Sequence, residues 1–179
     1  MPCDRVEEDK LKTIMPIFAL RRSDFTIKEG DISDIADKVG GVSKDVLSAL
    51  KRLEDKGYVA YKSEDSDNTA KRLYVAPLAL RRLTGELELR IVSLLLGYQL
   101  TSCARVVRHS KEDQPLIVGS NVPVSRIASY FESGKTMEEI QEDFQDLMED
   151  DFMDALRYYM HHRKEMINEV KEYIKADVI

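Results

Sequence analysis

The amino-acid sequence predicts a mainly α-helical fold with a small β component (α+β), divided between two small domains. Apolar residues recur at helical spacing in several separate segments. Two short segments rich in β-branched and aromatic residues, 58–62 and 71–76, lie on either side of a polar tip, as in a β-hairpin. The charge also changes along the chain: residues 1–82 hold 16 Lys/Arg and 15 Asp/Glu, whereas residues 83–179 hold 11 and 18. We therefore predict a domain at 1–82, a linker or dimerisation helix at 83–103, and a helical domain at 104–179.

The composition is that of a globular protein in a reducing compartment. The 179 residues are 43% hydrophobic, which is enough for one domain or two small ones. They contain no run of about 18 uncharged apolar residues, and the N-terminus lacks the apolar core of a signal peptide. Cys3 and Cys103 lie far apart and give neither a metal spacing nor a disulfide framework. We expect a cytoplasmic protein without a metal or cofactor.

The segments before residue 43 predict two helices and a short strand. Residues 8–22 have helical periodicity, although Pro16 inside the pattern should bend or shorten that helix. Residues 25–27 are expected to form a strand that pairs with the hairpin. Residues 31–39 form the second predicted helix, with Asp31 or Ser33 as its cap. Gly40 and Gly41 then supply a turn.

A third helix is predicted over Ser43–Lys56, with two contrasting faces. Ser43 is the expected N-cap, and Gly57 is the expected left-handed residue after the last turn. The inward face is apolar and consists of Val46, Leu47, Leu50 and Leu53. The outward face is polar and mostly basic and consists of Lys44, Ser48, Lys51, Arg52 and Asp55. Such a face suits the DNA major groove, but a surface helix with ordinary solvated lysines has the same pattern.

Residues 8–76 resemble a winged helix-turn-helix DNA-binding domain in their order of helix, strand, helix, turn, helix and hairpin. The resemblance implies that the third helix reads DNA and that the hairpin is the wing. The expected DNA-binding residues are Ser43, Lys44, Ser48, Lys51, Arg52, Lys62, Lys71 and Arg72. The tip of the wing is acidic and suits phosphate poorly. It lacks the glycine and terminal glutamate of a calcium loop.

Residues 78–83 and 86–100 are predicted to be helical. The second helix carries a broad apolar stripe, in which we expect Leu87, Ile91, Leu94 and Tyr98 to contact a dimer partner. The same stripe is equally compatible with a linker helix or with core packing inside the chain. Too few heptads are present to predict a coiled coil.

The last third of the chain predicts strands followed by helices. Residues 105–108 and 116–118 are the expected strands, and residues 125–132 form a helix with Val124, Ile127, Ala128 and Phe131 on one face. Thr136 and Glu139 have the spacing of a capping box that begins another short helix. Residues 151–175 form a long helix, and its expected inward positions are Phe152, Leu156, Tyr159 or Met160, Ile167, Val170 and Ile174.

Residues 105–163 resemble the domain-of-unknown-function family numbered 433. The resemblance rests on the segments PLIVGSNVPVSRI, FESGKTMEEIQEDF and DDFMDALRYYMHHR. The matching positions are Gly119, Pro123, Val124, Gly134, Glu139, Ile140, Ala155, Leu156 and Tyr159. The chain departs from the family pattern at Ser120-Asn121, Gln145 and Met148, where the family has Thr-Arg, Pro, and Thr or Ser. The missing arginine removes any charge-based role of that loop.

This second resemblance implies a small helix-turn-helix-like module preceded by a strand pair. The family is found in VapB-type antitoxins, which are generally paired with PIN-like nuclease toxins and are expected to dimerise. The resemblance implies no catalytic residues.

The residues alone also give no reason to expect an enzyme. There is no phosphate-binding glycine loop, no nucleophile elbow and no zinc spacing. His161 and His162 are neighbours on a helix and point about 100° apart, which is unsuitable for binding one metal. The acidic run near 138–151 is typical of a solvated face, although such a run can also pair with a basic protein. We therefore predict a dimeric DNA-binding transcription regulator or, alternatively, an antitoxin-type module that neutralises a PIN-like nuclease; one chain can do both.

Overall fold

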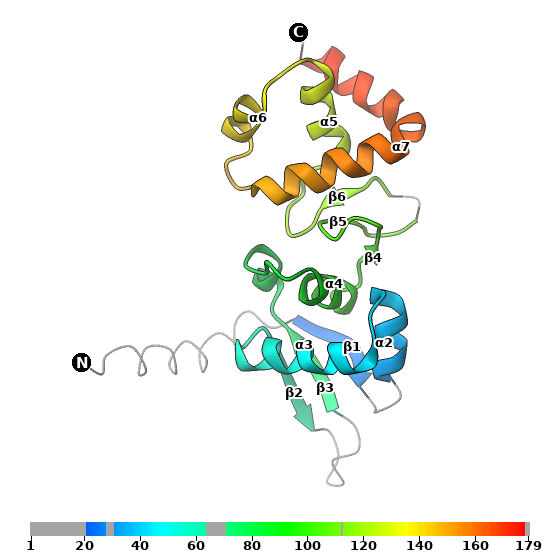
Figure 1. The fold of residues 1–179 in the computed structure, drawn as a ribbon, viewed down its shortest axis with the longest axis vertical. Coiled ribbons are helices and arrows are strands. Elements are labelled where there is room, and N and C mark those ends of the chain that lie inside the picture. Colours follow the sequence, from blue (N-terminus) through cyan, green and yellow to red (C-terminus); the bar gives the residue numbers. More distant parts are fainter. Residues whose placement is uncertain (1–20, 28–30, 64–70, 112, 178–179) are drawn as a thin grey trace, which may run out of the picture. The chain divides into compact units, whose positions relative to one another are not determined.

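The computed structural model describes residues 21–27, 31–63, 71–111 and 113–177 of the chain. It divides into two compact units, Met1–Gly97 and Tyr98–Ile179, which are called unit 1 and unit 2 and are described separately. Both combine helices with a three-stranded antiparallel sheet (Figure 1). The mainly helical α+β class predicted from the sequence is confirmed. No helix within the described ranges has the length and apolar character needed to span a membrane.

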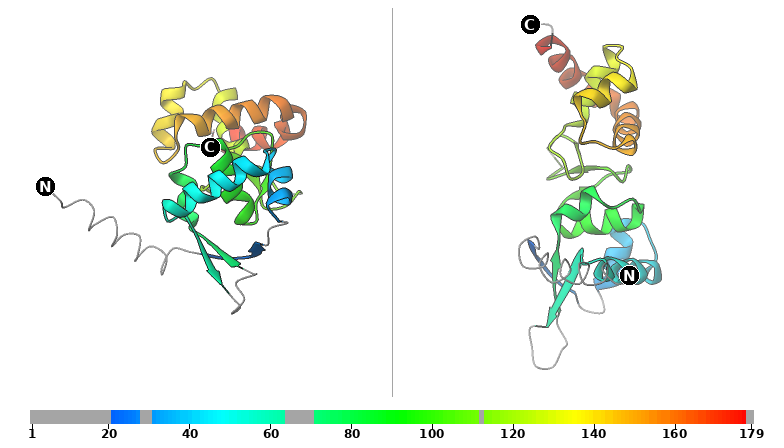
Figure 2. Two further views of the ribbon diagram at one scale, coloured as in Figure 1. Left: turned by 60° about the horizontal axis from the view of Figure 1, so that its bottom comes forward. Right: turned by 90° about the vertical axis from the view of Figure 1, so that its left-hand side faces the viewer.

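Along the chain of unit 1, two helices follow the first strand and a β-hairpin follows the helices. Strand β1 (Arg21–Ile27) is followed by α2 (Asp31–Val39) and α3 (Ser43–Asp55). Strands β2 (Val59–Ser63) and β3 (Lys71–Val75) form the hairpin, and a 3-10 turn, η1 (Pro77–Arg81), leads to α4 (Glu86–Leu95). The sheet order is β1-β3-β2, so β1 pairs with the hairpin as expected. The hairpin extends beyond the helices of its unit (Figures 1 and 2).

The core of unit 1 lies where α2, α3 and α4 meet. All three helices contact one another. Their buried apolar residues are Ile32, Ile35, Ala36, Val39, Val46, Ala49, Leu50, Leu53, Leu89, Ile91, Val92 and Leu95. Helix α4 therefore belongs to the core of this unit, because it contacts both other helices and its own apolar side chains are buried there.

The turn between α2 and α3 is fixed by two glycines and one arginine. Gly40 has a φ of +72°, a conformation that favours glycine, and the N–H of Gly41 donates to the carbonyl of Ala36 over 2.9 Å. The Nε–H of Arg90 on α4 donates to the carbonyl of Val39, the last residue of α2, over 3.0 Å. A Cβ on Gly41 would lie 3.4 Å from Leu87 Cδ1, so the turn packs closely on α4.

Several local predictions for unit 1 are wrong at the ends of elements. Arg21 and Arg22 lie in β1 instead of the predicted first helix, and residues 8–20 of that helix lie outside the described residues. The N-cap of α3 is Val42, and Ser43 is already the first helical residue. Leu47, expected inward, is 54% exposed. The helix predicted to reach residue 100 ends at Leu95, because Gly97 adopts a φ of +87°.

Unit 2 begins with a small sheet and continues with three helices. Strands β4 (Gln99–Leu100), β5 (Val106–Arg108) and β6 (Leu116–Ile117) pair in the order β4-β5-β6. They are followed by α5 (Val124–Glu132), α6 (Met137–Asp143) and α7 (Glu149–Ala176). The capping box at α6 is confirmed: the N–H of Thr136 donates to the Glu139 carboxylate, and the N–H of Glu139 donates to Thr136 Oγ1.

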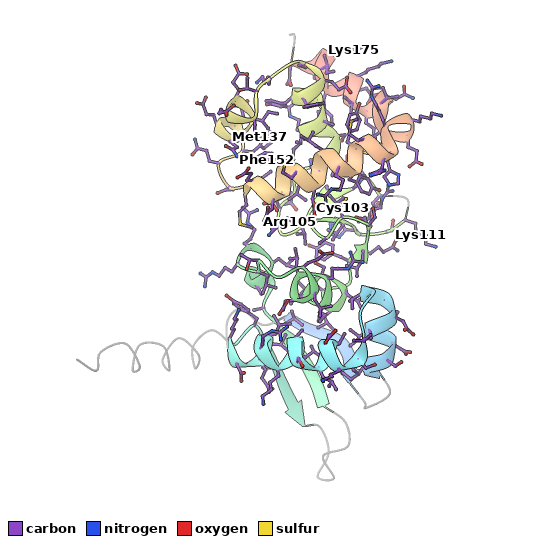
Figure 3. All side chains as sticks on the ribbon, viewed as in Figure 1. Cys103, Arg105, Lys111, Met137, Phe152 and Lys175 are labelled. Carbon is purple, nitrogen blue, oxygen red and sulfur yellow. The ribbon has the colours of Figure 1, made fainter. Side chains whose placement is uncertain are left out.

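Helix α7 supplies much of the core of unit 2 and bends at one residue. His162 has a φ of −112° and a ψ of 18°, which interrupts the helix. Before the bend, Phe152, Ala155, Tyr158 and Tyr159 are buried against the rest of unit 2 (Figure 3). On α5, Phe131 is 47% exposed, so its predicted place on the inward face is wrong. The inward neighbours predicted with it, including Ile127, are fully buried.

A buried ion pair ties the sheet of unit 2 to the start of α7. Arg105 Nη1 lies 3.1 Å from Asp151 Oδ1, and these side chains are only 6% and 4% exposed. The other oxygen of Asp151 accepts from the N–H of Met148 over 2.8 Å, which gives a partner to one backbone N–H at the start of the helix. This bond provides a cap at the position where the chain lacks the Thr or Ser of the family pattern.

Candidate nucleic-acid interface

The outward face of α3 is polar and carries two lysines. Its buried side consists of Val46, Ala49, Leu50 and Leu53, so the side chains on the other side of the helix project from unit 1. Lys44, Ser48, Lys51 and Asp55 are all exposed and follow one another at helical spacing. Among the described residues, neither lysine ammonium has a hydrogen-bond or ion-pair partner. The face therefore presents two available cations within about two helical turns.

Ser48 is attached to its own helix. Its hydroxyl donates to the carbonyl of Lys44 over 2.9 Å. The oxygen retains free lone pairs, so the hydroxyl remains an acceptor on this face, or a donor if it rotates. Ser43 is also exposed and lies at the first position of the helix, where backbone N–H groups have no helical partners.

Arg52 lies on the side of α3 that faces α4. Its Nε–H donates to Glu88 Oε1 over 2.8 Å, and its Nη2 lies 2.6 Å from the same oxygen. Burial alone would raise the pKa of Glu88, but the hydrogen bond and charge of Arg52 outweigh that effect and lower the pKa below its ordinary value of 4.5. The Arg52 side chain is still 53% exposed. It therefore stabilises the α3–α4 contact and has its charge partly neutralised, unlike Lys44 and Lys51.

The three basic residues predicted on the wing lie on the two strands of the hairpin. Lys62 of β2 pairs with Arg72 of β3, and Ser63 pairs with Lys71. Their positions thus come together beside the tip. The side chains of these basic residues, the tip at 64–70 and its acidic residues lie outside the described part of the structure.

Two exposed aliphatic side chains near the lysines were not predicted as site residues. Leu47 is 54% exposed, and Val42, which immediately precedes α3, is 60% exposed. The sequence pattern assigned Leu47 to the core because it follows Val46, although neighbouring helical residues point about 100° apart. Comparing Leu47 with Leu50 and Leu53 around the helix would have shown its position at the edge of the polar face.

The four residues predicted to contact a dimer partner have different environments. Ile91 is fully buried, so its side chain is already used in the core of unit 1. Leu87 and Leu94 of α4 are partly exposed. Tyr98 is the first residue of unit 2, where its ring centroid lies 5.1 Å from that of His109.

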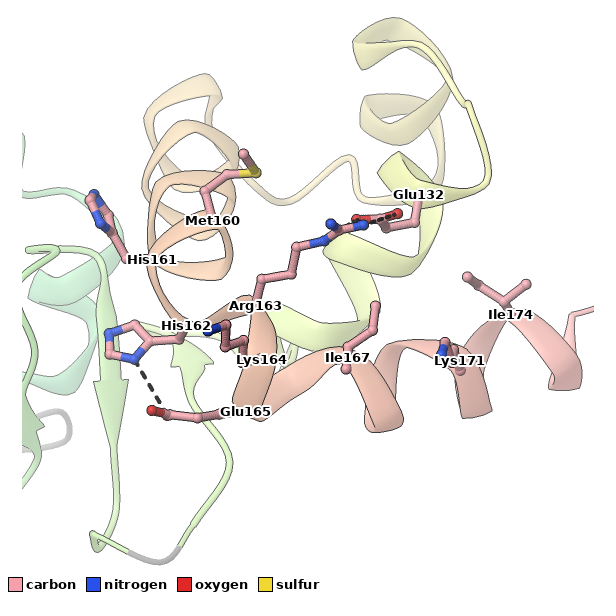
Figure 4. Close-up of a pocket in the computed structure, with 10 residues that line it drawn as sticks. All are labelled: Glu132, Met160, His161, His162, Arg163, Lys164, Glu165, Ile167, Lys171 and Ile174. Atoms are coloured by element: carbon pink, nitrogen blue, oxygen red, sulfur yellow. Dashed lines mark hydrogen bonds and ion pairs between the residues drawn. The ribbon is translucent and has the colours of Figure 1, made fainter.

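The described residues contain no group of three or more His, Cys, Asp or Glu side chains arranged to hold a metal ion. In Figure 4, His161 and His162 point away from Glu132 and Arg163, and His162 Nδ1 lies 3.4 Å from Glu165 Oε2. His162 and Glu165 form an ion pair when the imidazole is protonated.

Comparison with known protein families gives a match in unit 2. Residues 112–159 match the family described as "Protein of unknown function (DUF433)". The matched range runs through β6, α5, α6 and the part of α7 before its bend, which confirms the resemblance of this part of the chain. No curated protein and no solved structure matches the chain.

Proposed function

We propose that the chain is a DNA-binding transcription regulator and that unit 1 is a winged helix-turn-helix domain that reads double-stranded DNA with α3. The observation that carries the proposal is the outward face of α3, where Lys44 and Lys51 are exposed and have no partner among the described residues. The opposite face is fully used in the core, so the helix can enter a groove without loss of packing.

In this proposal the basic residues of unit 1 have different roles. Lys44 and Ser48, near the start of α3, are placed to contact base edges, while Lys51 contacts phosphate. Lys62, Lys71 and Arg72 of the wing contact the backbone beside the groove. Arg52 contributes less, because Glu88 already neutralises part of its charge. As a homodimer, the chain would place two such helices about one turn of DNA apart.

A titration by fluorescence anisotropy tests the proposal. The full chain is mixed with labelled DNA from its own promoter region, and with random DNA of equal length, at two salt concentrations. We expect tighter binding to the promoter and a salt slope near −0.9 for each phosphate contacted. Absence of binding to both DNAs at low salt would overturn the proposal.

Paired substitutions assign the binding to α3. Lys44→Ala with Lys51→Ala should weaken binding by more than about tenfold and reduce the salt slope. The control combines Lys111→Ala with Lys175→Ala, which removes the same charge from exposed positions outside α3. Arg52→Ala should have a smaller effect than Lys51→Ala. If the control pair weakens binding as much as the α3 pair, only net charge matters and the assignment of α3 is wrong.

A second function is favoured by a separate surface of unit 2. Exposed acidic side chains cover α6 and the first turn of α7, namely Glu138, Glu139, Glu142, Asp143, Glu149 and Asp150. Two exposed methionines, Met148 and Met153, lie among or beside them. Carboxylates around apolar side chains suit a basic protein surface. This surface supports an antitoxin-type role, in which unit 2 binds a PIN-like nuclease.

Inhibition of a nuclease tests this second function. Where a PIN-like gene lies beside the gene of this chain, its product is the nuclease to use, and the readout is cleavage of a labelled RNA with and without the chain. Glu138→Lys with Glu142→Lys should abolish inhibition. The matched reversal Glu169→Lys with Glu172→Lys, at the other end of α7, should leave it intact. Unchanged cleavage in the presence of the wild-type chain would argue against the antitoxin role.

A further inference from the structure

The part of α7 before its bend carries a row of apolar side chains that the fold leaves exposed. Met153, Leu156 and Met160 are three and four residues apart, so they lie along one face of the helix, and this set is called the apolar row. Met153 is 50% exposed, Met160 is 63% exposed, and Leu156 is partly exposed. Figure 4 shows Met160 just before the bend. Because all three residues precede His162, the helix is uninterrupted along the row.

The two methionines of the apolar row are not needed for the packing of unit 2. The same stretch of α7 buries Phe152, Ala155 and Tyr159 on another face. Leu156 contacts the core, whereas the methionines on either side of it face solvent. Methionine is unbranched and flexible, so it adapts to the shape of a partner surface. The row therefore offers about two helical turns of adaptable apolar surface.

Two available carboxylates lie at the start of the apolar row. Glu149 is exposed, lies four residues before Met153 on the same face, and has no hydrogen-bond or ion-pair partner among the described residues. Asp150 is 77% exposed and lies 3.7 Å from Arg105, whose closer partner is Asp151 at 3.1 Å. This end of the row is therefore negative.

The positive charge within the same stretch of α7 is already bound. Arg157 Nη1 donates to Asp154 Oδ1 over 3.1 Å, so this arginine does not offset the two carboxylates. His161, beside Met160, adds no full charge at pH 7. Lys164 follows the bend, where the helix no longer continues the face of the row. The row is therefore negative at its start and close to neutral along the rest of its length.

We propose that the apolar row binds an amphipathic helix of a basic partner protein, whose lysines or arginines pair with Glu149 and Asp150. Apolar positions three and four residues apart are those along which two helices pair. The inference rests on the second proposed function, because it takes the acidic surface of unit 2 to bind a basic protein, and it adds which element is bound. A second copy of α7 is a poor occupant, since its residues before the bend include no unpaired lysine or arginine to face these carboxylates.

Binding of two designed helical peptides to the full chain tests the proposal. Each labelled peptide has about three heptads with leucine on the seam, and the flanking positions are lysine in one and glutamate in the other. Fluorescence anisotropy should give about tenfold tighter binding of the lysine peptide. Glu149→Lys with Asp150→Lys should reverse the preference. The matched control, Glu169→Lys with Glu172→Lys, changes exposed positions of α7 beyond the bend and should leave the preference unchanged. If the control removes the preference equally, only net charge matters and the proposal is wrong.

Two further variants test the apolar row and guard against misfolding. Met153→Gln with Met160→Gln should weaken both peptides about tenfold, because it makes the row polar without adding charge. The milder pair Glu149→Gln with Asp150→Asn should remove the preference even if the charge reversal disturbs folding, which circular dichroism would detect. Failure to bind either peptide, or equal binding of both, would overturn the proposal. So would self-association of the wild type that Met153→Gln with Met160→Gln abolishes, since the occupant would then be a second copy.

The inference and the antitoxin role can fail separately. If the wild-type chain inhibits the nuclease and Met153→Gln with Met160→Gln inhibits it equally, the inference is overturned while the antitoxin role stands. If the lysine peptide binds as expected but the wild-type chain leaves nuclease cleavage unchanged, the inference stands and the antitoxin role is overturned.

Discussion

The exposed lysines of α3 in unit 1 and the arginines of unit 2 are used in opposite ways. On α3 of unit 1, Lys44 and Lys51 are exposed and have no partner among the described residues. In unit 2 the arginines are engaged: Arg126 donates to both oxygens of Asp177 at 2.9 Å, and Arg108 donates to Tyr158 Oη at 2.8 Å. The difference shows that net charge is a poor guide to binding. The arginines of unit 2 count toward its charge, but they bind side chains of the same unit and are not available to a partner. Free lysines mark the surfaces that remain for partners.

The nature of the side chains explains this division. Arginine has a planar fork that binds two acceptors at once, which suits fixed contacts between elements such as α5 and α7. Arg126 also lies 5.0 Å from the ring centroid of Tyr130, so its planar face is in use as well. Lysine is a flexible point charge that contributes little to a folded contact and remains available in solvent.

Loss of the buried ion pair between Arg105 and Asp151 should lower the stability of unit 2 more than any other substitution considered below. Asp151→Ala leaves Arg105 charged and buried, so we expect unit 2 to lose about 3–5 kcal/mol. Chemical unfolding followed by circular dichroism measures the change. Asp150→Asn is the control: that carboxylate lies 3.7 Å from the same arginine but is 77% exposed, and its loss should be nearly neutral. Equal effects of the two substitutions would contradict a dominant role for the buried pair.

Two leucines of α3 should separate packing from surface exposure in unit 1. Leu50→Ala removes a side chain that is 3% exposed and should destabilise the unit by about 2–5 kcal/mol. Leu47→Ala removes one that is 54% exposed and should change stability by less than about 0.5 kcal/mol. Thermal unfolding distinguishes them. If Leu47→Ala also lowers the melting temperature strongly, the outward orientation of this face is wrong.

The exposed position of Leu47 gives a sharper prediction for the proposed DNA contact. An aliphatic side chain beside Lys44 and Lys51 can cover the methyl group of thymine. Replacing thymine by deoxyuridine in the promoter DNA should then weaken binding roughly fourfold per contacted methyl, from about 0.8 kcal/mol of apolar burial. Leu47→Ala should bind the two DNAs equally. If both proteins show the same difference between the two DNAs, the methyl contact lies elsewhere.

The Arg52–Glu88 pair should give the smallest effect, and the effect should depend on pH. Because the folded pKa of Glu88 lies below its ordinary value of 4.5, the pair stabilises unit 1 above that pH. The contribution is lost as the pH falls through the folded pKa. With Arg52 half exposed, we expect no more than about 1 kcal/mol. Glu88→Gln should therefore be less stable than wild type at pH 7 and equally stable near pH 2, as measured by urea unfolding.

Features within short stretches of sequence were predicted well. The helix at 31–39 and the capping box of Thr136 and Glu139 have the predicted positions, and the hairpin strands lie within one residue of theirs, because each depends on periodicity or spacing over a few residues. The helix ends were less accurate. Ser43 was expected to cap α3, but the extended backbone lies at Val42, so Ser43 begins the helix.

Contacts between distant residues could not be predicted from the same patterns. Arg52 and Glu88 are 36 residues apart, and Arg105 and Asp151 are 46 apart, so their meeting depends on how the elements pack. No proline lies at the bend at His162, so the bend could not be predicted from the sequence. Exposure of Leu47 was missed for a different reason: its position around the helix, away from Leu50 and Leu53, follows from the sequence alone, but it was assigned to the core together with its neighbour Val46.

The bend at His162 also determines where α7 opens first. It divides the helix into stretches too short to be stable alone in water, so each depends on what it packs against. The first stretch buries two tyrosines and a phenylalanine, whereas the second buries only Met166 and Val170. Amide hydrogens beyond His162 should therefore exchange with solvent faster than those before it. The part of α7 before His162 would stay folded while the part after it repeatedly unfolds and re-forms.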